Sequence, residues 1–196
     1  EISDWADAYF NRTKRTVEHF GDVPVTYAVF MRRPVVCAPR LAVDWINNVA
    51  RSRGVSFDID LRHDEGKWVG AGEPLLYISG SFRHLVDLET LFLQKIGPAC
   101  VAAYNASIMC ADLPKVAFLA MDARHCAGLE MAELMAYAAS VGSARRSRTN
   151  AWAKVRTSVD WVRSLKTSLA ARSVSLASQL VVSTSSPRAA EATSTP

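Results

Sequence analysis

Arg124 and His125 stand side by side in the segment MDARHCAGLEMAELMAYAASVGS (121–143), shortly before a long apolar stretch. The residues in front of it, KVAFLA (115–120), are typical of a buried strand. Polar groups that follow such a strand lie where α/β proteins commonly bind ligands. Arg124 therefore has the position and the chemistry to hold a carboxylate or phosphate through two hydrogen bonds. An ion pair of Arg124 with Asp122 or Glu130 is an equally weighted alternative.

A second cationic segment, MRRPVVCAPR (31–40), sets three arginines beside two prolines. Proline fixes the backbone angle φ, so the loop would be stiff. A stiff loop that carries Arg32 and Arg33 suits the binding of phosphate groups. From the residues alone, a solvated surface turn is the favoured explanation of the same pattern.

Several common catalytic motifs are missing from the sequence. It contains no GxxxxGK[ST] phosphate loop, GxGxxG dinucleotide loop, HExxH zinc motif or GxSxG nucleophile elbow. These absences exclude several frequent enzyme classes. The cysteines are widely spaced and form no CxxC pair, so we expect reduced thiols rather than a metal centre; they are Cys37, Cys100, Cys110 and Cys126.

The net charge of +4 is unevenly distributed along the 196 residues. Residues 143–196 contain nine Lys/Arg against two Asp/Glu, whereas the remainder of the chain is mildly acidic. A nucleic-acid function would therefore depend on the tail alone, and we expect no nucleic-acid partner. No run approaches the ~18 apolar residues of a membrane helix, and no secretory signal opens the chain. We expect a cytoplasmic protein without a membrane partner.

Apolar periodicity and turn residues predict an α/β protein, with an antiparallel part followed by αβ alternation. The predicted helices cover residues 4–19, 41–53, 82–96 and 98–110, and another follows Gly128. The predicted strands cover 23–31 and 115–120, with a small antiparallel meander within 55–81 that turns at Glu65-Gly66 and Ala71-Gly72. Gly97-Pro98 is the predicted break between two helices. The last helix is predicted to bury Met131, Leu134, Met135 and Ala138.

Three segments, in order, resemble the nicotinate phosphoribosyltransferase family. DWADAYFNRTKRTVEHFGDVPVTYAVFMRR (4–33) resembles its opening helix and the strand that ends in Phe-x-Arg. EGKWVGAGEPLLYISGSFRHLVDLETLFLQKIGPACVAAYNA (65–106) is similar to its glycine-punctuated hairpin and Leu-Glu-Thr helix pair. DARHCAGLEMAELMAYAASVGS (122–143) is similar to its Ala-Arg-x-x-x-Gly loop and helix. The resemblance covers about residues 1–143.

The resemblance implies a type II phosphoribosyltransferase, an α/β fold with an α+β N-terminal domain (1–110) and the beginning of an irregular α/β barrel (111–143). It implies an enzyme that joins nicotinate to phosphoribosyl pyrophosphate, with Mg²⁺ and ATP hydrolysis, to give nicotinate mononucleotide. It also implies a homodimer in which Tyr9 stacks on the pyridine ring across the subunit interface. Arg124 would bind nicotinate or the ribose phosphate, and Arg32 and Arg33 would approach the phosphates.

The sequence departs from the family in two places. Many relatives have an aromatic residue before the barrel arginine, where Met121-Asp122 stand here. The family's Gly-Thr-x-Pro-His segment, whose histidine is phosphorylated by ATP, is missing, so no catalytic residue is assigned. Residues 144–196 form a basic, Ser/Arg-rich tail that we expect to be divergent or frame-shifted, in a truncated chain of little or no activity. A relative acting on nicotinamide or quinolinate, and a non-catalytic binding protein with a basic tail, remain open alternatives.

Overall fold

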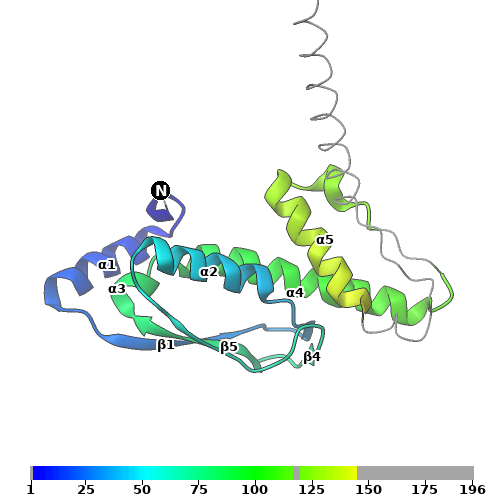
Figure 1. Cartoon of the computed structure of the whole chain (residues 1–196), viewed down its shortest axis with the longest axis horizontal. Coiled ribbons are helices and arrows are strands. Elements are labelled where there is room, and N and C mark those ends of the chain that lie inside the picture. Colours follow the sequence, from blue (N-terminus) through cyan, green and yellow to red (C-terminus); the bar gives the residue numbers. More distant parts are fainter. Residues whose placement is uncertain (1, 117–119, 145–196) are drawn as a thin grey trace, which may run out of the picture. The chain divides into compact units, whose positions relative to one another are not determined.

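In the computed structural model, residues 2–116 and 120–144 are described. The mixed α/β class predicted from the sequence is confirmed, and the described residues form no closed barrel. The elements, labelled in Figure 1 where there is room, follow the order η1 (Ile2–Asp4), α1 (Ala8–Phe20), β1 (Pro24–Phe30), β2 (Val35–Val36), α2 (Arg40–Ser52), β3 (Asp58–Leu61), β4 (Trp68–Val69), β5 (Pro74–Ser81), α3 (Phe82–Leu85), α4 (Glu89–Asp112), η2 (Asp122–His125) and α5 (Leu129–Ala144).

The main sheet is antiparallel and has the strand order β1-β5-β3. Both turns predicted within residues 55–81 are present, but the predicted meander is wrong in its pairing. β4 leaves this sheet and pairs with β2, which places the buried Val69 opposite the buried Val35. Turn residues show where the chain reverses, and they do not specify which strand receives the next one.

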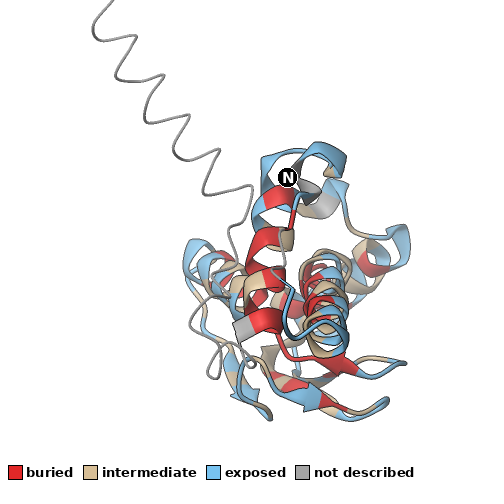
Figure 2. Ribbon diagram, turned by 90° about the vertical axis from the view of Figure 1, so that its right-hand side faces the viewer, coloured by how far each residue is buried: buried red, intermediate tan, exposed pale blue. Residues whose placement is uncertain are grey.

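Helices α2 and α4 run along one face of the sheet, as Figure 1 shows. α2 buries Ala42, Ile46, Val49 and Ala50, which recur at the spacing of one helix face. Buried residues concentrate where the helices meet one another and the sheet (Figure 2). The largest fully buried side chains include Ile46, Leu75, Leu76, Ile78, Leu85, Leu88 and Ile96. The core therefore joins α2, β5 and α4.

Helix α4 continues through Pro98, so the break predicted at Gly97-Pro98 is wrong. Proline removes one backbone hydrogen bond inside a helix. Its neighbours on both sides nevertheless share one buried face, which includes Ile96, Ala99, Cys100 and Ala103. Burial of this continuous face outweighs the local cost of the proline. The actual interruption lies at residues 86–88, between α3 and α4.

Helices α4 and α5 pack closely against each other. Lys95 of α4 pairs with Glu130 near the start of α5, and Ala103 meets Gly142 near its end. Ala138 is buried as predicted and Leu134 and Met135 are partly buried, but Met131 is exposed. Ala132, Ala136, Ala138 and Ala139 are among the buried residues of α5, and the close approach at Gly142 needs a residue without a side chain. The sequence pattern of large apolar side chains therefore predicted the burial of Met131 wrongly.

The strand predicted over residues 115–120 falls largely outside the description. Residues 117–119 are not described, residues 114–116 form a turn and bend, and the buried Ala120 forms a single bridge. Among the helices of the described residues, none is long and apolar enough to cross a membrane.

Candidate functional site

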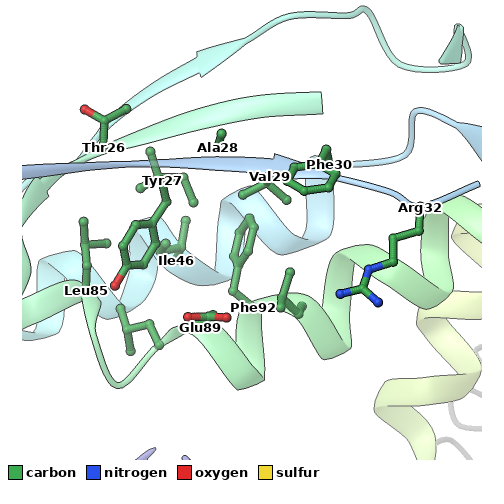
Figure 3. Close-up of a pocket in the computed structure, with 13 residues that line it drawn as sticks. Thr26, Tyr27, Ala28, Val29, Phe30, Arg32, Ile46, Leu85, Glu89 and Phe92 are labelled. Carbon is green, nitrogen blue, oxygen red and sulfur yellow. The ribbon is translucent and has the colours of Figure 1, made fainter. Parts of the chain in front are cut away.

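A cavity of about 460 Å³ lies between strand β1 and helix α4 (Figure 3). Its floor is apolar, and β1, β5, α2, α3 and α4 all contribute to it. Polar groups occupy its edges, with Tyr27 and Glu89 toward one end and Arg32 at the other. A cavity with an apolar floor and a few polar groups at its edge is suited to a flat, partly charged ligand.

The charge of Glu89 acts on the pKa of two tyrosines, Tyr27 in the cavity wall and Tyr9 on α1. Burial and the charges of Glu89 and Asp87 raise the pKa of Tyr27 to about 12. Burial and the nearby Asp7 raise the pKa of Glu89 as well. Tyr27 therefore stays protonated at neutral pH and can donate a hydrogen bond there.

Tyr9 lies on α1, 57% exposed, with its ring centroid 4.1 Å from that of Phe10. Partial desolvation and the carboxylates of Asp7 and Glu89 raise its pKa. The hydroxyl of Thr90 donates a hydrogen bond of 3.2 Å to Asp7, which ties the start of α1 to the first turn of α4. Tyr9 therefore lies near the start of α4, and it is more than half exposed.

The two arginines after β1 face different surroundings. Arg32 lines the cavity, and its guanidinium extends toward α4 in Figure 3. The guanidinium of Arg33 lies 5.8 Å from the ring centroid of Tyr104, a cation–π arrangement. Only Arg32 of this pair is therefore brought to the cavity.

Arg124 lies in η2, exposed to solvent, and does not line the cavity. Its Nη2 lies 3.9 Å from the sulfur of Met121. Glu130, one of the two ion-pair partners considered for it, pairs with Lys95 instead. The side chain of Asp122, the other candidate, is not described. Arg124 and Arg32 therefore do not line one cavity within the described chain.

A buried charge cluster beside the cavity was missed at the level of sequence. Asp87 is 1% exposed and receives two hydrogen bonds from Arg53, at 2.8 and 3.0 Å, and one from Lys14 at 2.7 Å. Burial alone would raise the pKa of Asp87, but the hydrogen bonds and charges of Arg53 and Lys14 hold it below its ordinary value. The signal that could have found it is an acid inside the apolar run LVDLETLF (85–92).

Among residues 2–116 and 120–144, no three His, Cys, Asp or Glu side chains are placed to hold a metal ion. The Mg²⁺ expected from the resemblance stays a prediction, because Mg²⁺ is commonly held by one or two carboxylates together with substrate phosphates. No metal-dependent step is assigned to them.

Residues 7–100 match the family model described as the N-terminal domain of quinolinate phosphoribosyl transferase. No curated protein matches the chain. Solved structures share its fold at low identity. The nicotinate-nucleotide pyrophosphorylase of Francisella tularensis matches 72% of this chain and 52% of its own, with 16% identity and a TM-score of 0.54. The pyrophosphorylase of Pyrococcus furiosus matches 72% and 36%, with 21% identity and a TM-score of 0.61.

Human nicotinic acid phosphoribosyltransferase shares the fold as well, with 19% identity and a TM-score of 0.55 over 68% of this chain and 34% of its own. The chain thus spans about half the length of these proteins or less. The comparisons support a phosphoribosyltransferase family, as the sequence resemblance indicated. The model that matches is the quinolinate one, not the nicotinate one that the resemblance named.

Proposed function

We propose that this chain carries the N-terminal part of a phosphoribosyltransferase that attaches a pyridine carboxylate to ribose in NAD biosynthesis. The observation that carries this proposal is the match of residues 7–100 to the quinolinate phosphoribosyl transferase N-terminal domain. The shared fold with two kinds of pyridine-nucleotide enzyme adds support. Because the chain spans only part of those proteins, the activity of the whole protein belongs to the proposal.

The reaction joins the ring nitrogen of the pyridine to C1 of the ribose of phosphoribosyl pyrophosphate. The bond from C1 to the pyrophosphate oxygen breaks, and pyrophosphate leaves with the bonding electrons. Cations that neutralise the departing anion and a ring that supports the flat acid are the groups this chemistry needs. We assign the first role to Arg32, Arg33 and Arg124, and the second to Tyr9. Their exposure supports these roles.

Tyr9 is proposed to serve the neighbouring subunit of a homodimer. Its side chain stands out from α1, whose buried residues are Phe10 and Val17. Arg124 does not line the cavity, and the proposal places it with the Tyr9 of the other subunit at one shared site. Subunits carrying Tyr9→Ala mixed with subunits carrying Arg124→Ala are expected to bind ligand at one intact site per heterodimer. Heterodimers without ligand binding would contradict this arrangement.

Nicotinate, with ATP as co-substrate, is the first candidate substrate. In its favour, Arg32 is the one Lys or Arg among the described residues that line the cavity, and the carboxylate of Glu89 lines the cavity toward its other end. A second carboxylate on the ligand would call for more positive charge than this cavity provides. Quinolinate is the second candidate, because the matching family model is named for it. Quinolinate must in addition lose one carboxyl group as CO₂ to give the same nucleotide.

Binding of the two acids to the purified chain tests the proposal. Proton NMR of nicotinate or quinolinate at millimolar concentration reports binding as broadening of the ring-proton lines. We expect broadening by the chain, stronger for nicotinate, and a reduced effect with Tyr9→Ala. Stronger broadening of quinolinate would select the second candidate. If neither acid is affected, with or without phosphoribosyl pyrophosphate, the proposed function is wrong for this chain.

A further inference from the structure

Helix α1 is attached to the rest of the described fold mainly through polar contacts. It buries only Phe10 and Val17. Its polar links run to a short stretch of chain around α3 and the start of α4. Lys14 pairs with Asp87 at 2.7 Å, Glu18 with Arg83 at 3.3 Å, and Asp7 accepts a hydrogen bond from Thr90 at 3.2 Å. Because α1 buries so little apolar surface, its attachment depends strongly on whichever of these polar contacts is shielded from water.

The Lys14–Asp87 ion pair is the most buried of the polar contacts that attach α1. Asp87 is 1% exposed and the Lys14 side chain is 28% exposed, whereas the Arg83 and Glu18 side chains are 51% and 39% exposed. Exposed pairs contribute little, because water and salt screen them. Burial makes the Lys14 contact the stronger of the two ion pairs.

Arg53 also pairs with Asp87, so the effect of removing Lys14 can be measured without leaving Asp87 unpaired. From the end of α2, Arg53 donates to both carboxylate oxygens of Asp87 and to the carbonyl oxygen of His84 at 2.8 Å. These bonds hold residues 84–87 on α2 without any help from α1. Loss of Lys14 therefore leaves Asp87 paired and removes only the link to α1.

We propose that Lys14 is a positioning residue, which fixes α1 on Asp87 so that Tyr9 is held near the start of α4. Lys14 lies little more than one helical turn beyond Tyr9 on the same helix. Anchoring Lys14 thus sets both the rotation and the axial position of α1. The consequence for ligand binding rests on the proposed function, in which Tyr9 contacts the pyridine ring.

Hydrogen exchange in the purified 196-residue chain tests the anchoring without reference to any ligand. Lys14→Met is expected to speed exchange of the α1 amides at least about tenfold, as expected for the loss of a partly buried ion pair. The amides of α2 and α4 should keep their protection, because Arg53 still holds Asp87. Lys14→Arg should retain most of the α1 protection. Arg12→Met, which removes an exposed cation from the same helix, is the matched control and should have no effect.

Unchanged α1 exchange in Lys14→Met, or an equal loss in Arg12→Met, would overturn the proposal. A loss of protection throughout the chain would also overturn it, since Lys14 would then support the whole fold and not α1 alone.

Line broadening of nicotinate by the same variants tests the link to Tyr9. If the unmodified chain broadens nicotinate, Lys14→Met should reduce the effect about as much as Tyr9→Ala, and Lys14→Arg should restore it. Undiminished broadening with Lys14→Met would contradict the positioning role. If the unmodified chain does not broaden nicotinate, the ligand role of Tyr9 fails, while hydrogen exchange still decides whether Lys14 anchors α1. The two failures are therefore distinguishable.

Discussion

Gly142 of α5 lies so close to Ala103 of α4 that a Cβ atom at position 142 would stand 2.0 Å from the carbonyl oxygen of Ala103. A backbone carbonyl in the middle of α4 cannot rotate away as a side chain can. The contact therefore requires glycine for steric reasons, although glycine is unfavourable inside a helix. It sets the spacing between the two helices.

Gly142→Ala is expected to destabilise the fold by about 1–3 kcal/mol, because α5 must move away from α4. Urea denaturation followed by circular dichroism measures the change. Glu133→Ala, which alters an exposed residue of the same helix, is the control and should stay within about 0.5 kcal/mol of the unmodified chain. Equal stability of the Gly142→Ala and unmodified chains would show that the helices are not packed this closely.

Asp87→Asn is expected to cost about 3 kcal/mol or more, since Arg53 and Lys14 would lose the charge that compensates their burial. The same denaturation experiment measures it. Asp60→Asn is the matched control, because the Asp60–Arg62 pair at 3.0 Å has both side chains 54% exposed. Exposed pairs contribute about 1 kcal/mol or less. Similar costs for the two variants would contradict the importance of the buried cluster.

The free energy of unfolding should also decrease as the pH falls, because Asp87 becomes protonated. The pKa of Asp87 is lower in the folded chain than in the unfolded chain, so the unfolded state takes up a proton first as the pH falls. The stabilisation is complete above the unfolded pKa of about 4 and is lost as the pH drops toward the folded pKa. Urea midpoints measured from pH 7 to pH 3 should decline less steeply in Asp87→Asn. Parallel curves for the two chains would exclude this contribution.

Cys37 and Cys100 should react slowly with alkylating reagents. Both thiols are buried, and burial raises their pKa values to about 12 and about 11. The reactive thiolate is then scarce at pH 8. Mass spectrometry after timed alkylation should find Cys110 and Cys126, which are partly exposed, modified first. Denaturant should remove the difference, and rapid modification of Cys100 in the folded chain would contradict the core described for α4.

The parts of the fold that local patterns determine were predictable. β1 and α2 appear within one or two residues of their predicted ends, because alternation and helical periodicity are local signals. The helix break predicted at Pro98 was wrong. The proline removes one local hydrogen bond, but burial of the whole α4 face stabilises the helix by more than that loss. β2 and β4 pair although α2 and β3 separate them in the sequence, so no local pattern of residues could predict this pairing.

The candidate site was predictable only in part. Arg32 and Tyr9 could be named from the sequence. Arg32 lines the cavity, and the charge of Glu89 acts on Tyr9. The Asp87 cluster joins residues 14, 53 and 87, and only the fold brings them together. The sequence could not show that Arg32 lines the cavity and Arg33 does not. The guanidinium of Arg33 lies over the ring of Tyr104, a residue distant in the sequence.

Binding of phosphoribosyl pyrophosphate by the purified chain tests the central claim most directly. Phosphorus NMR of the compound at millimolar concentration should show broadened signals in the presence of the chain. Arg32→Ala and Arg124→Ala should each weaken binding about tenfold or more, as expected for the loss of about 1.5–3 kcal/mol per charged hydrogen-bonding group. Arg62→Ala, a surface change away from both arginines, should leave binding unchanged. Phosphorus signals that stay sharp with the unmodified chain, or that broaden equally with all three variants, would contradict the account.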